Sequence, residues 1–180
     1  MIVGYHNIYK LTNIIRYCQK SKIKNESVAE HSYFVGWFIL DLCKKNNIPD
    51  DIKLLALETG LLHDIPEIIT NDITYDVKKM IPEIPQLLQP YEEEIIGEYS
   101  KEAQKTLYNP ESPAEIIANR LVTHADNLSV FQYCEHEERL GNKNFTILKN
   151  DSMLRVAKSR ELLEEAIEQY LGGNKNAKEQ

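Results

Sequence analysis

The chain has 180 residues and a formal net charge of -7, and 27% of its residues are charged. A chain of this length can bury a continuous core as one domain, without disulfides or a structural zinc ion. The acidic balance argues against a polymeric nucleic acid partner, because such binding depends on neutralising many phosphates. Small ligands stay open, including anions that a bound metal ion would attract.

The cysteines and the apolar stretches indicate the compartment. Cys18, Cys43 and Cys134 are odd in number and far apart, so they predict neither a disulfide framework nor a thiolate zinc site. The first 19 residues mix apolar and charged side chains and lack the apolar centre of a secretion signal. No stretch approaches the roughly 18 apolar residues of a membrane span. We expect a soluble protein of the reducing cytoplasm, without membrane contact.

Apolar residues recur at helical spacing along most of the chain, and the sequence therefore predicts an all-α fold. A first helix is expected over about residues 3–19, followed by a polar loop over residues 20–26. The segment Ser27-Val28-Ala29-Glu30 forms a capping box, in which Ser27 and Glu30 satisfy each other's backbone amides. A second helix is therefore expected to begin here.

This second predicted helix carries a histidine among core positions. Val28, His31, Val35, Phe38 and Leu42 follow one another at steps of three and four, on one face of a helix. We therefore expect His31 to point inward.

A third helix is expected from about residue 51 to the pair His63-Asp64, with a face of small side chains at Ala56, Thr59 and Gly60. Pro66 disfavours helical backbone at the residue before it. Asp64 is then expected near the helix end, where its carboxylate can turn toward the same centre as His63.

The second half of the chain alternates breaks and helices. Prolines predict a loop with short helical turns over residues 70–90, followed by one helix over residues 91–108. Ser112-Pro113-Ala114-Glu115 is a second capping box, and the helix that it starts carries Asp126. A last helix is expected over residues 152–171, ending at Gly172-Gly173. Residues 1–173 then form one domain, and residues 174–180 a mobile tail.

His31, His63, Asp64 and Asp126 lie on three predicted helices, and a bundle could bring them onto one ion. Two imidazoles and two carboxylates suit Mn, Fe, Co, Ni or Zn better than Mg or Ca. Such an ion activates water for attack on phosphorus. Each residue alone has a plainer explanation, because a histidine on an apolar face is more often a core residue and a His-Asp pair often occurs by chance. Their combination favours metal-dependent hydrolysis.

Several short motifs extend this pattern over about residues 10–140. In chain order they are Ile14-Ile15-Arg16-Tyr17, Glu26-Ser27-Val28-Ala29-Glu30-His31-Ser32, His63-Asp64-Ile65-Pro66-Glu67, Thr70-Asn71-Asp72-Ile73, Val77-Lys78 and Ala125-Asp126. On these motifs the chain resembles the HD-domain phosphohydrolases, and more closely the bacterial 5'-deoxynucleotidases. The resemblance implies an HD-domain helical bundle and one divalent metal ion held by His31, His63, Asp64 and Asp126. It also implies hydrolysis of deoxyribonucleoside 5'-monophosphates to deoxynucleoside and phosphate.

The same resemblance implies roles for five further residues. Glu67 would serve as general acid or base, and Asp72 would lie near the leaving 5'-oxygen or the sugar. Arg16 and Lys78 would bind phosphate, and Tyr17 would pack on the sugar and exclude a 2'-hydroxyl. Ordinary alternatives are surface charges for Arg16, Lys78 and Glu67, a turn for Asp72 and core packing for Tyr17.

Asn71 and Thr74 stand where the nucleotidases carry Gly and Pro, so the loop over the nucleotide is expected to differ in shape. A triphosphohydrolase acting on a substrate such as dATP stays an alternative because of six nearby cations: Arg16, Lys20, Lys22, Lys24, Lys78 and Lys79. A non-catalytic nucleotide-binding protein is a further alternative. We also expect a homodimer or higher homo-oligomer, with Val130, Phe131 and Tyr133 as a candidate interface unless they belong to the core.

Overall fold

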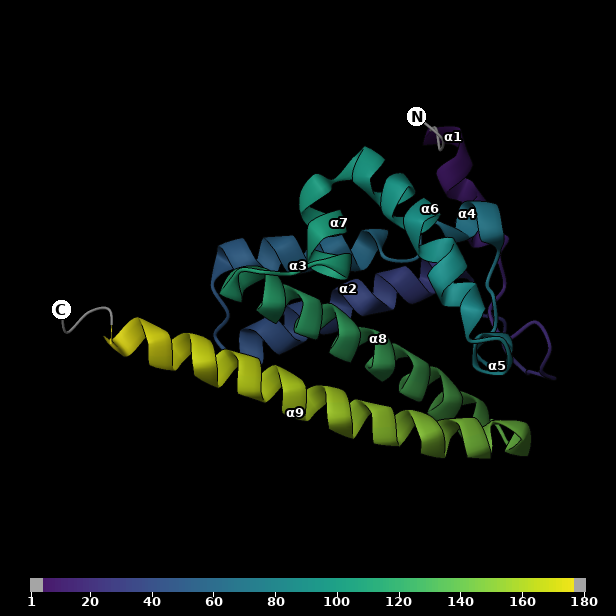
Figure 1. The fold of residues 1–180 in the computed structure, drawn as a ribbon. Coiled ribbons are helices and arrows are strands. Elements are labelled where there is room, and N and C mark those ends of the chain that lie inside the picture. The colour runs from purple at the N-terminus through teal and green to yellow at the C-terminus, as the bar shows by residue number, and fades with distance from the viewer. Residues whose placement is uncertain (1–4, 177–180) are drawn as a thin grey trace.

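The computed structural model describes residues 5–176, and these residues form helices joined by loops (Figure 1). The elements are α1 (Tyr5–Ile8), the 3-10 helix η1 (Tyr9–Thr12), α2 (Val28–Lys45), α3 (Asp50–Leu62), α4 (Glu67–Thr70), α5 (Tyr75–Met80), α6 (Glu83–Tyr99), α7 (Lys101–Tyr108), α8 (Pro113–Arg139), the 3-10 helix η2 (Lys143–Phe145) and α9 (Thr146–Asn176). Within this part of the chain there is no strand, only an isolated bridge between Ile15 and Ser27. The all-α prediction is confirmed. No helix in the described range has the length and apolarity to cross a membrane.

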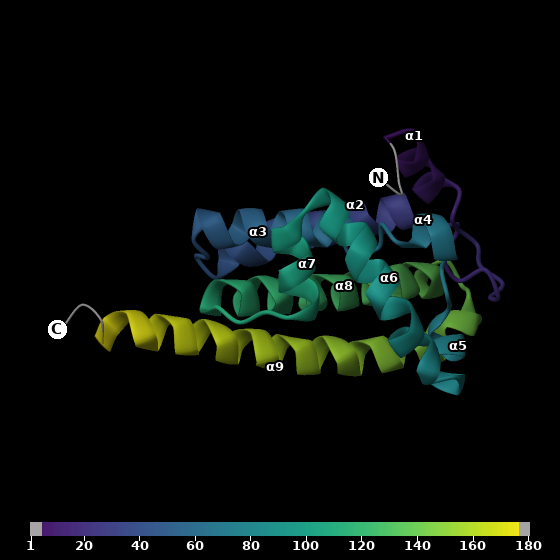
Figure 2. The same ribbon diagram turned by 45° about the horizontal axis from the view of Figure 1, so that its top comes forward.

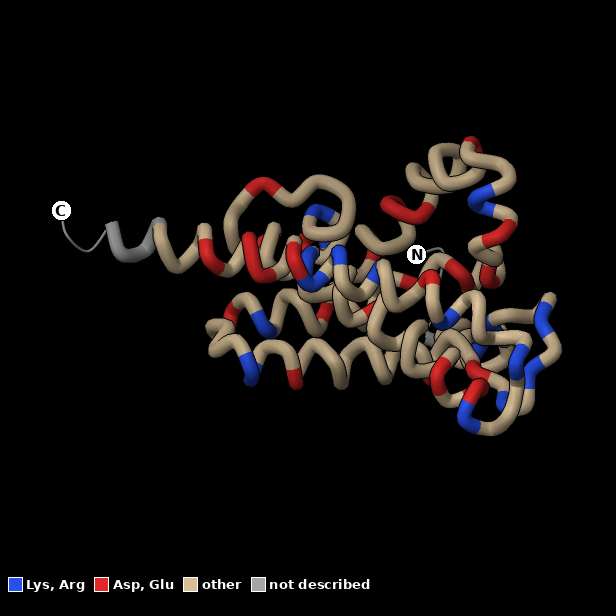
Figure 3. Tube along the Cα trace, turned by 90° about the horizontal axis from the view of Figure 1, so that it is seen from below, with Lys and Arg blue, Asp and Glu red and all other residues tan. Residues whose placement is uncertain are grey.

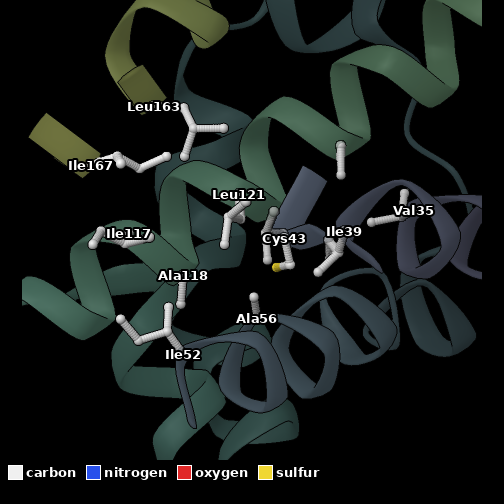
Figure 4. Packing of buried hydrophobic residues seen from close by; sticks show 12 residues of the cluster. Val35, Ile39, Cys43, Ile52, Ala56, Ile117, Ala118, Leu121, Leu163 and Ile167 are labelled. Atoms are coloured by element: carbon white, nitrogen blue, oxygen red, sulfur yellow. The ribbon is translucent and has the colours of Figure 1, made fainter. Parts of the chain in front are cut away.

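The helices α2, α3, α8 and α9 form the main body of the molecule (Figures 1 and 2). The two longest, α8 and α9, lie side by side in opposite directions. The inner faces of α2, α3, α8 and α9 share one apolar core, shown in Figure 4, in which Val35, Ile39, Ala56 and Leu121 are fully buried. The burial of such side chains stabilises the fold by about 1.5–3 kcal/mol for each large residue.

Close approach of α2 and α3 depends on Gly60. A Cβ atom at this position would lie 2.4 Å from Cδ1 of Ile39, so a larger residue would require the buried Ile39 side chain or the helices to shift. The small inner face predicted for α3 is confirmed, because Ala56, Thr59 and Gly60 are all buried. This contact brings the end of α3 beside the first turns of α2.

Both predicted capping boxes are present. The Ser27 hydroxyl accepts from the Glu30 amide, and the Glu30 carboxylate accepts from the Ser27 amide, at the start of α2. Ser112 and Glu115 repeat the arrangement at the start of α8, with Pro113 in the first turn. The bounds of α3 also agree with the prediction to within two residues.

The first predicted helix is wrong. Residues 3 and 4 lie outside the described residues, and from residue 5 the chain forms only the short α1 and η1 before it turns into a loop. Arg16 donates its amide to the carbonyl of Glu26 at 2.9 Å, and Tyr17 has a φ of 55°. Both features are incompatible with a continuing α-helix.

The proline-rich segment is more regular than predicted. Residues 75–80 form α5, and α6 begins at Glu83 and continues through Pro90. Pro85 is tolerated because it lies in the first turn, where backbone amides have no partner within the helix. The single helix predicted over residues 91–108 is wrong, because Ser100 is extended and its hydroxyl caps α7 by accepting from Ala103 at 3.0 Å.

The last helix is longer than predicted at both ends. It begins at Thr146, whose hydroxyl donates to Glu138 on α8 at 2.7 Å, and continues past Gly172 to Asn176. The predicted end at Gly172-Gly173 is therefore wrong, because no left-handed turn forms there. Residues 177–180 of the predicted tail lie outside the described residues.

Candidate metal centre and adjoining pocket

Three donor groups from α2 and the end of α3 converge at one point. One ligand atom from each of His31, His63 and Asp64 lies within 4.8 Å of the other two. His31 is fully buried, as its place on the apolar face of α2 predicts. Asp126 joins them from α8, with Oδ1 3.2 Å from Nε2 of His31. The structure thus brings all four predicted ligands together.

Asp64 reaches this point because the chain turns after α3. The amide of Ile65 donates to the carbonyl of Leu62, and that of Glu67 donates to Asp64, in two tight turns. These turns let neighbouring side chains face one centre, whereas on a continuous helix they would diverge by about 100°. Oδ2 of Asp64 lies 3.4 Å from Nε2 of His31 and 3.3 Å from Nε2 of His63.

The two imidazoles are oriented through their other ring nitrogens. Nδ1 of His63 lies 2.7 Å from the carbonyl of Gly60, to which it donates, and Nδ1 of His31 lies 3.0 Å from the Ser129 hydroxyl. Both Nε2 atoms are buried and have no hydrogen-bond partner within the described part of the chain. Two unpartnered nitrogens facing two carboxylates fit a divalent metal ion, and the nitrogen set favours a transition metal.

The charges around the histidines affect the two rings differently. Burial and the nearby Arg16 guanidinium lower the pKa of His31 to about 4, which leaves its Nε2 lone pair available. Burial also disfavours charge on His63, but the adjacent Asp64 carboxylate outweighs it and raises the pKa of His63 to about 9. A bound cation would replace the proton that His63 otherwise holds.

Next to this centre lies a pocket of about 190 Å³. Asp64 and Asp126 form its metal-facing side, and every other predicted site residue outside the two histidines also contributes to its wall, namely Arg16, Tyr17, Glu67, Asp72 and Lys78. Figure 3 shows Lys and Arg gathered toward the end of the molecule away from the C-terminus, where the loops of this region lie. The pocket therefore combines a cation-binding side with basic side chains.

Glu67 is placed to exchange a proton in this pocket. Its Oε2 atom is buried and makes no hydrogen bond to any described residue. Burial raises the pKa of Glu67 to about 8, and the charges of Asp64 and Asp72 act in the same direction. A carboxyl group with a pKa near neutrality can both donate and accept a proton at physiological pH.

Arg16 lies in the same pocket with its charge partly compensated. Nη1 of Arg16 lies 3.3 Å from Oε2 of Glu26, and both side chains are largely buried. Glu26 was not predicted as a site residue, and its place just before the capping box gave no signal of this pairing. The ion pair holds the guanidinium beside the pocket and leaves further N–H groups for a ligand.

The ring of Tyr17 packs against other aromatic rings of the chain, whereas the predicted contact with a sugar requires a ring face that is free. It stacks on Tyr133 with ring centroids 4.9 Å apart, and Phe145 meets its edge at 5.7 Å. The core-packing alternative thus describes much of this side chain, although Tyr17 also lines the pocket.

Asp72 connects the two segments that carry the substrate-side residues. Its Oδ2 accepts from the amide of Tyr17 at 3.3 Å. Asn71 has a φ of 57° and a ψ of 174°, a conformation that glycine favours, and Thr74 has a φ of -60°, which proline would also adopt. The backbone at the two departures from the nucleotidase pattern therefore matches what Gly and Pro would impose.

Two residues far along the chain hold the loop of residues 13–27 in place. The buried carboxylate of Glu137 accepts from the amides of Ile23 and Lys24 at 2.8 and 2.7 Å. Asn142 donates to that carboxylate at 2.6 Å and to the carbonyl of Ser21 at 2.9 Å. Sequence patterns missed these contacts because a Glu near a helix end is ordinarily a solvated charge.

For two of the three candidate interface residues, the core alternative is confirmed. Val130 and Tyr133 are buried within the chain, together with Cys134 and Phe145. Three exposed aromatic side chains lie together on α2, where Tyr33, Phe34 and Trp37 line a separate groove of about 580 Å³.

Solved structures of other proteins share this fold. A conserved hypothetical protein from Pyrococcus furiosus has a TM-score of 0.70 and 26% identity, over 92% of this chain and 98% of that one. The HD phosphohydrolase DatZ of cyanophage S-2L, solved with dA and one catalytic Zn²⁺ ion, has a TM-score of 0.66 and 19% identity, over 96% of this chain and 99% of that one. An HD-domain phosphohydrolase from Listeria innocua has a TM-score of 0.65 and 19% identity, over 93% of this chain and 84% of that one.

No curated protein sequence matches the chain significantly. The family described as 5'-deoxynucleotidase YfbR-like matches residues 5–170, which includes every candidate site residue. The chain therefore belongs to the YfbR-like 5'-deoxynucleotidase family.

Proposed function

We propose that the protein removes the 5'-phosphate from deoxyribonucleoside 5'-monophosphates, with one divalent transition metal ion held by His31, His63, Asp64 and Asp126. The observation that carries this proposal is the pair of buried, unpartnered Nε2 atoms that face two carboxylates at the end of a basic pocket. The catalytic Zn²⁺ ion of the similar phage enzyme supports the choice of a transition metal.

The chain's own residues then have separate tasks around the phosphate. A cation held by these four residues would supply charge neutralisation on the phosphoryl oxygens and activation of water. Glu67 moves the proton, because its Oε2 atom faces the pocket without a competing partner. Arg16 orients the phosphate through the N–H groups that Glu26 does not occupy. Asp72 holds the segment with Arg16 and Tyr17 at the pocket through its bond to the Tyr17 amide.

Contacts within the chain engage several of the cations on which the triphosphate alternative rests, and this supports a monophosphate. Of the six counted in the sequence, Lys22 donates its ammonium group to the carbonyls of Arg16 and Tyr17 at 2.7 and 3.0 Å. Lys20 lies 3.6 Å from Asp76, and Arg16 is paired with Glu26. These contacts leave less positive charge for two additional phosphates than the sequence suggests.

The oligomeric state and the cellular location of the protein are further parts of this proposal. We propose a homo-oligomer whose contact includes the exposed aromatic side chains of α2, and light scattering of the purified protein measures its mass. A cytoplasmic location is supported by the three cysteines, which are free in the structure.

The test is hydrolysis of three substrate panels, the deoxynucleoside monophosphates, the ribonucleoside monophosphates and the deoxynucleoside triphosphates, with Mn²⁺, Co²⁺ or Mg²⁺. We expect phosphate release mainly from the deoxynucleoside monophosphates with Mn²⁺ or Co²⁺. Release of tripolyphosphate from the triphosphates would instead support the triphosphohydrolase alternative. Metal and nucleotide binding without turnover would support the non-catalytic one.

A further inference from the structure

Arg155 on α9 is a pocket residue that none of the sequence motifs includes. Its side chain lines the pocket, and its Nε atom is buried without a hydrogen-bond partner in the described part of the chain. The guanidinium carbon lies 5.0 Å from the ring centroid of Tyr75, which is itself 50% exposed. A buried, unpartnered guanidinium nitrogen is costly unless a ligand or water satisfies it.

The position of Arg155 along α9 determines which part of α8 it faces. His124 and Ser159 are in contact at 2.9 Å, and Glu138 contacts Thr146 at 2.7 Å, so the two helices run antiparallel in this register. Arg155, one turn before Ser159, therefore lies beside the turn of α8 that follows His124 and leads to Val130.

The wall around Arg155 is suited to a nucleobase. Ile73, Val130 and Leu148 line the same pocket and offer apolar surface, and Tyr75 offers an aromatic face. Arg16, Glu67 and Lys78 supply the charged groups on the side of the metal ligands. Small-molecule sites commonly combine such apolar walls with a single placed polar group that fixes orientation.

We infer that Arg155 and Tyr75 form the nucleobase subsite, in which the guanidinium donates to a base carrying two adjacent acceptors. This inference rests on the proposed function and adds a preference among its substrates. A guanidinium has donors and no acceptor. Guanine accepts a pair of hydrogen bonds through N7 and O6, whereas adenine offers N7 beside a donor amino group. The subsite therefore favours dGMP over dAMP.

The test compares three substrates in the wild-type protein and in Arg155→Gln: dGMP, dAMP and deoxyribose 5-phosphate, which lacks a base. We expect the variant to lower kcat/KM for dGMP about tenfold, mainly through KM, which is the discrimination typical of one bidentate contact. The values for dAMP and deoxyribose 5-phosphate should change less than about twofold. Arg160→Gln is the matched control, because Arg160 lies on the same helix, exposed and paired with Glu164 at 2.7 Å.

A similar loss for all three substrates would overturn the inference, because it would place Arg155 on the phosphate or in folding. An unchanged kcat/KM for dGMP would overturn it as well. Calorimetric titration of dGMP and dAMP into the metal-loaded protein tests the same preference without turnover. If no nucleotide is hydrolysed, the proposed function fails, and the binding ratio still decides the role of Arg155.

Discussion

The two sides of the pocket are built differently. On the metal side, His31, His63 and Asp126 extend from or directly follow long helices whose packing is fixed by the apolar core. Arg16 and Tyr17, in contrast, extend from the loop between η1 and α2, and side chains more than a hundred residues away bind the backbone of this loop. The metal side is therefore positioned by the core, and the substrate side by individual polar contacts.

Substitutions on the two sides of the pocket should therefore have different effects. Loss of a ligand on the rigid side should remove the ion and leave the fold intact. Loss of a loop contact should weaken substrate binding and stability together, because loops open locally at lower free energy than packed helices. Variants on each side test whether the distinction holds.

The largest effect is expected from Asp126→Asn. The variant removes one carboxylate charge from the metal centre while the helix that carries it stays packed. Metal content should fall well below one ion per chain, and phosphate release should fall to the background of the assay, as elemental analysis and a phosphatase assay would show. Asp151→Asn on the exposed surface is the control. Full metal occupancy in Asp126→Asn would remove this residue from the ligand set.

Glu67→Gln should lower kcat by about 10²- to 10⁴-fold, the usual contribution of a general acid or base. The amide keeps the shape of the side chain and cannot transfer the proton. Metal content and the affinity for dNMP should stay near the wild-type values in calorimetric titrations. Wild-type turnover in the variant would exclude Glu67 from the mechanism.

The same residue gives the metal-free protein a pH dependence. Its folded-state pKa is raised to about 8 from an ordinary value of 4.5, so the folded protein keeps a proton that the unfolded chain releases between these values. The stability that this group contributes is complete below about pH 4.5 and is lost as pH rises toward 8. In thermal unfolding of the chelator-treated proteins, the stability of Glu67→Gln relative to wild type should therefore increase as pH rises from 5 to 8. A constant difference would contradict the raised pKa.

On the loop side, Glu137→Ala leaves three hydrogen-bond donors without their acceptor. We expect a loss of about 2–4 kcal/mol in the free energy of unfolding, because each unsatisfied buried donor costs about 1–3 kcal/mol and the loop can expose part of them. KM should rise as Arg16 and Tyr17 lose their fixed positions, while metal content stays at one ion per chain. Glu135→Ala, two residues away in a surface ion pair with Arg139, should change stability by less than about 1 kcal/mol. Loss of metal in Glu137→Ala would show that the two sides are not independent.

The smallest effect is expected from Asn71→Gly. The backbone at this position is unfavourable for any residue with a Cβ atom. Glycine relieves this strain, but it also raises the conformational entropy of the unfolded chain, which opposes the gain. The net result should be a stabilisation of about 1 kcal/mol, measured by denaturant unfolding. A loss of stability would mean that the Asn71 side chain supports the loop.

Short sequence patterns predicted the structure correctly where it depends on contacts between residues that are close in the sequence. The two capping boxes and the inward position of His31 follow from residues within one or two turns, and the structure has all of them. The backbone at Tyr17 depends on Tyr133 and Phe145, which are distant in sequence, so helical spacing alone predicted a helix in its place. Arg155 was missed for the same reason, since only tertiary packing brings α9 to the pocket.

The central claim is that His31 binds a metal ion through Nε2, and His124 offers a matched comparison. Both histidines are buried, and each contacts a serine hydroxyl through Nδ1, at 3.0 Å to Ser129 and 2.9 Å to Ser159. Titration of Mn²⁺ or Co²⁺ into metal-free protein should show one site in wild type and His124→Gln. That site should be lost or weakened at least about tenfold in His31→Gln. Equal affinity in all three proteins would contradict the account.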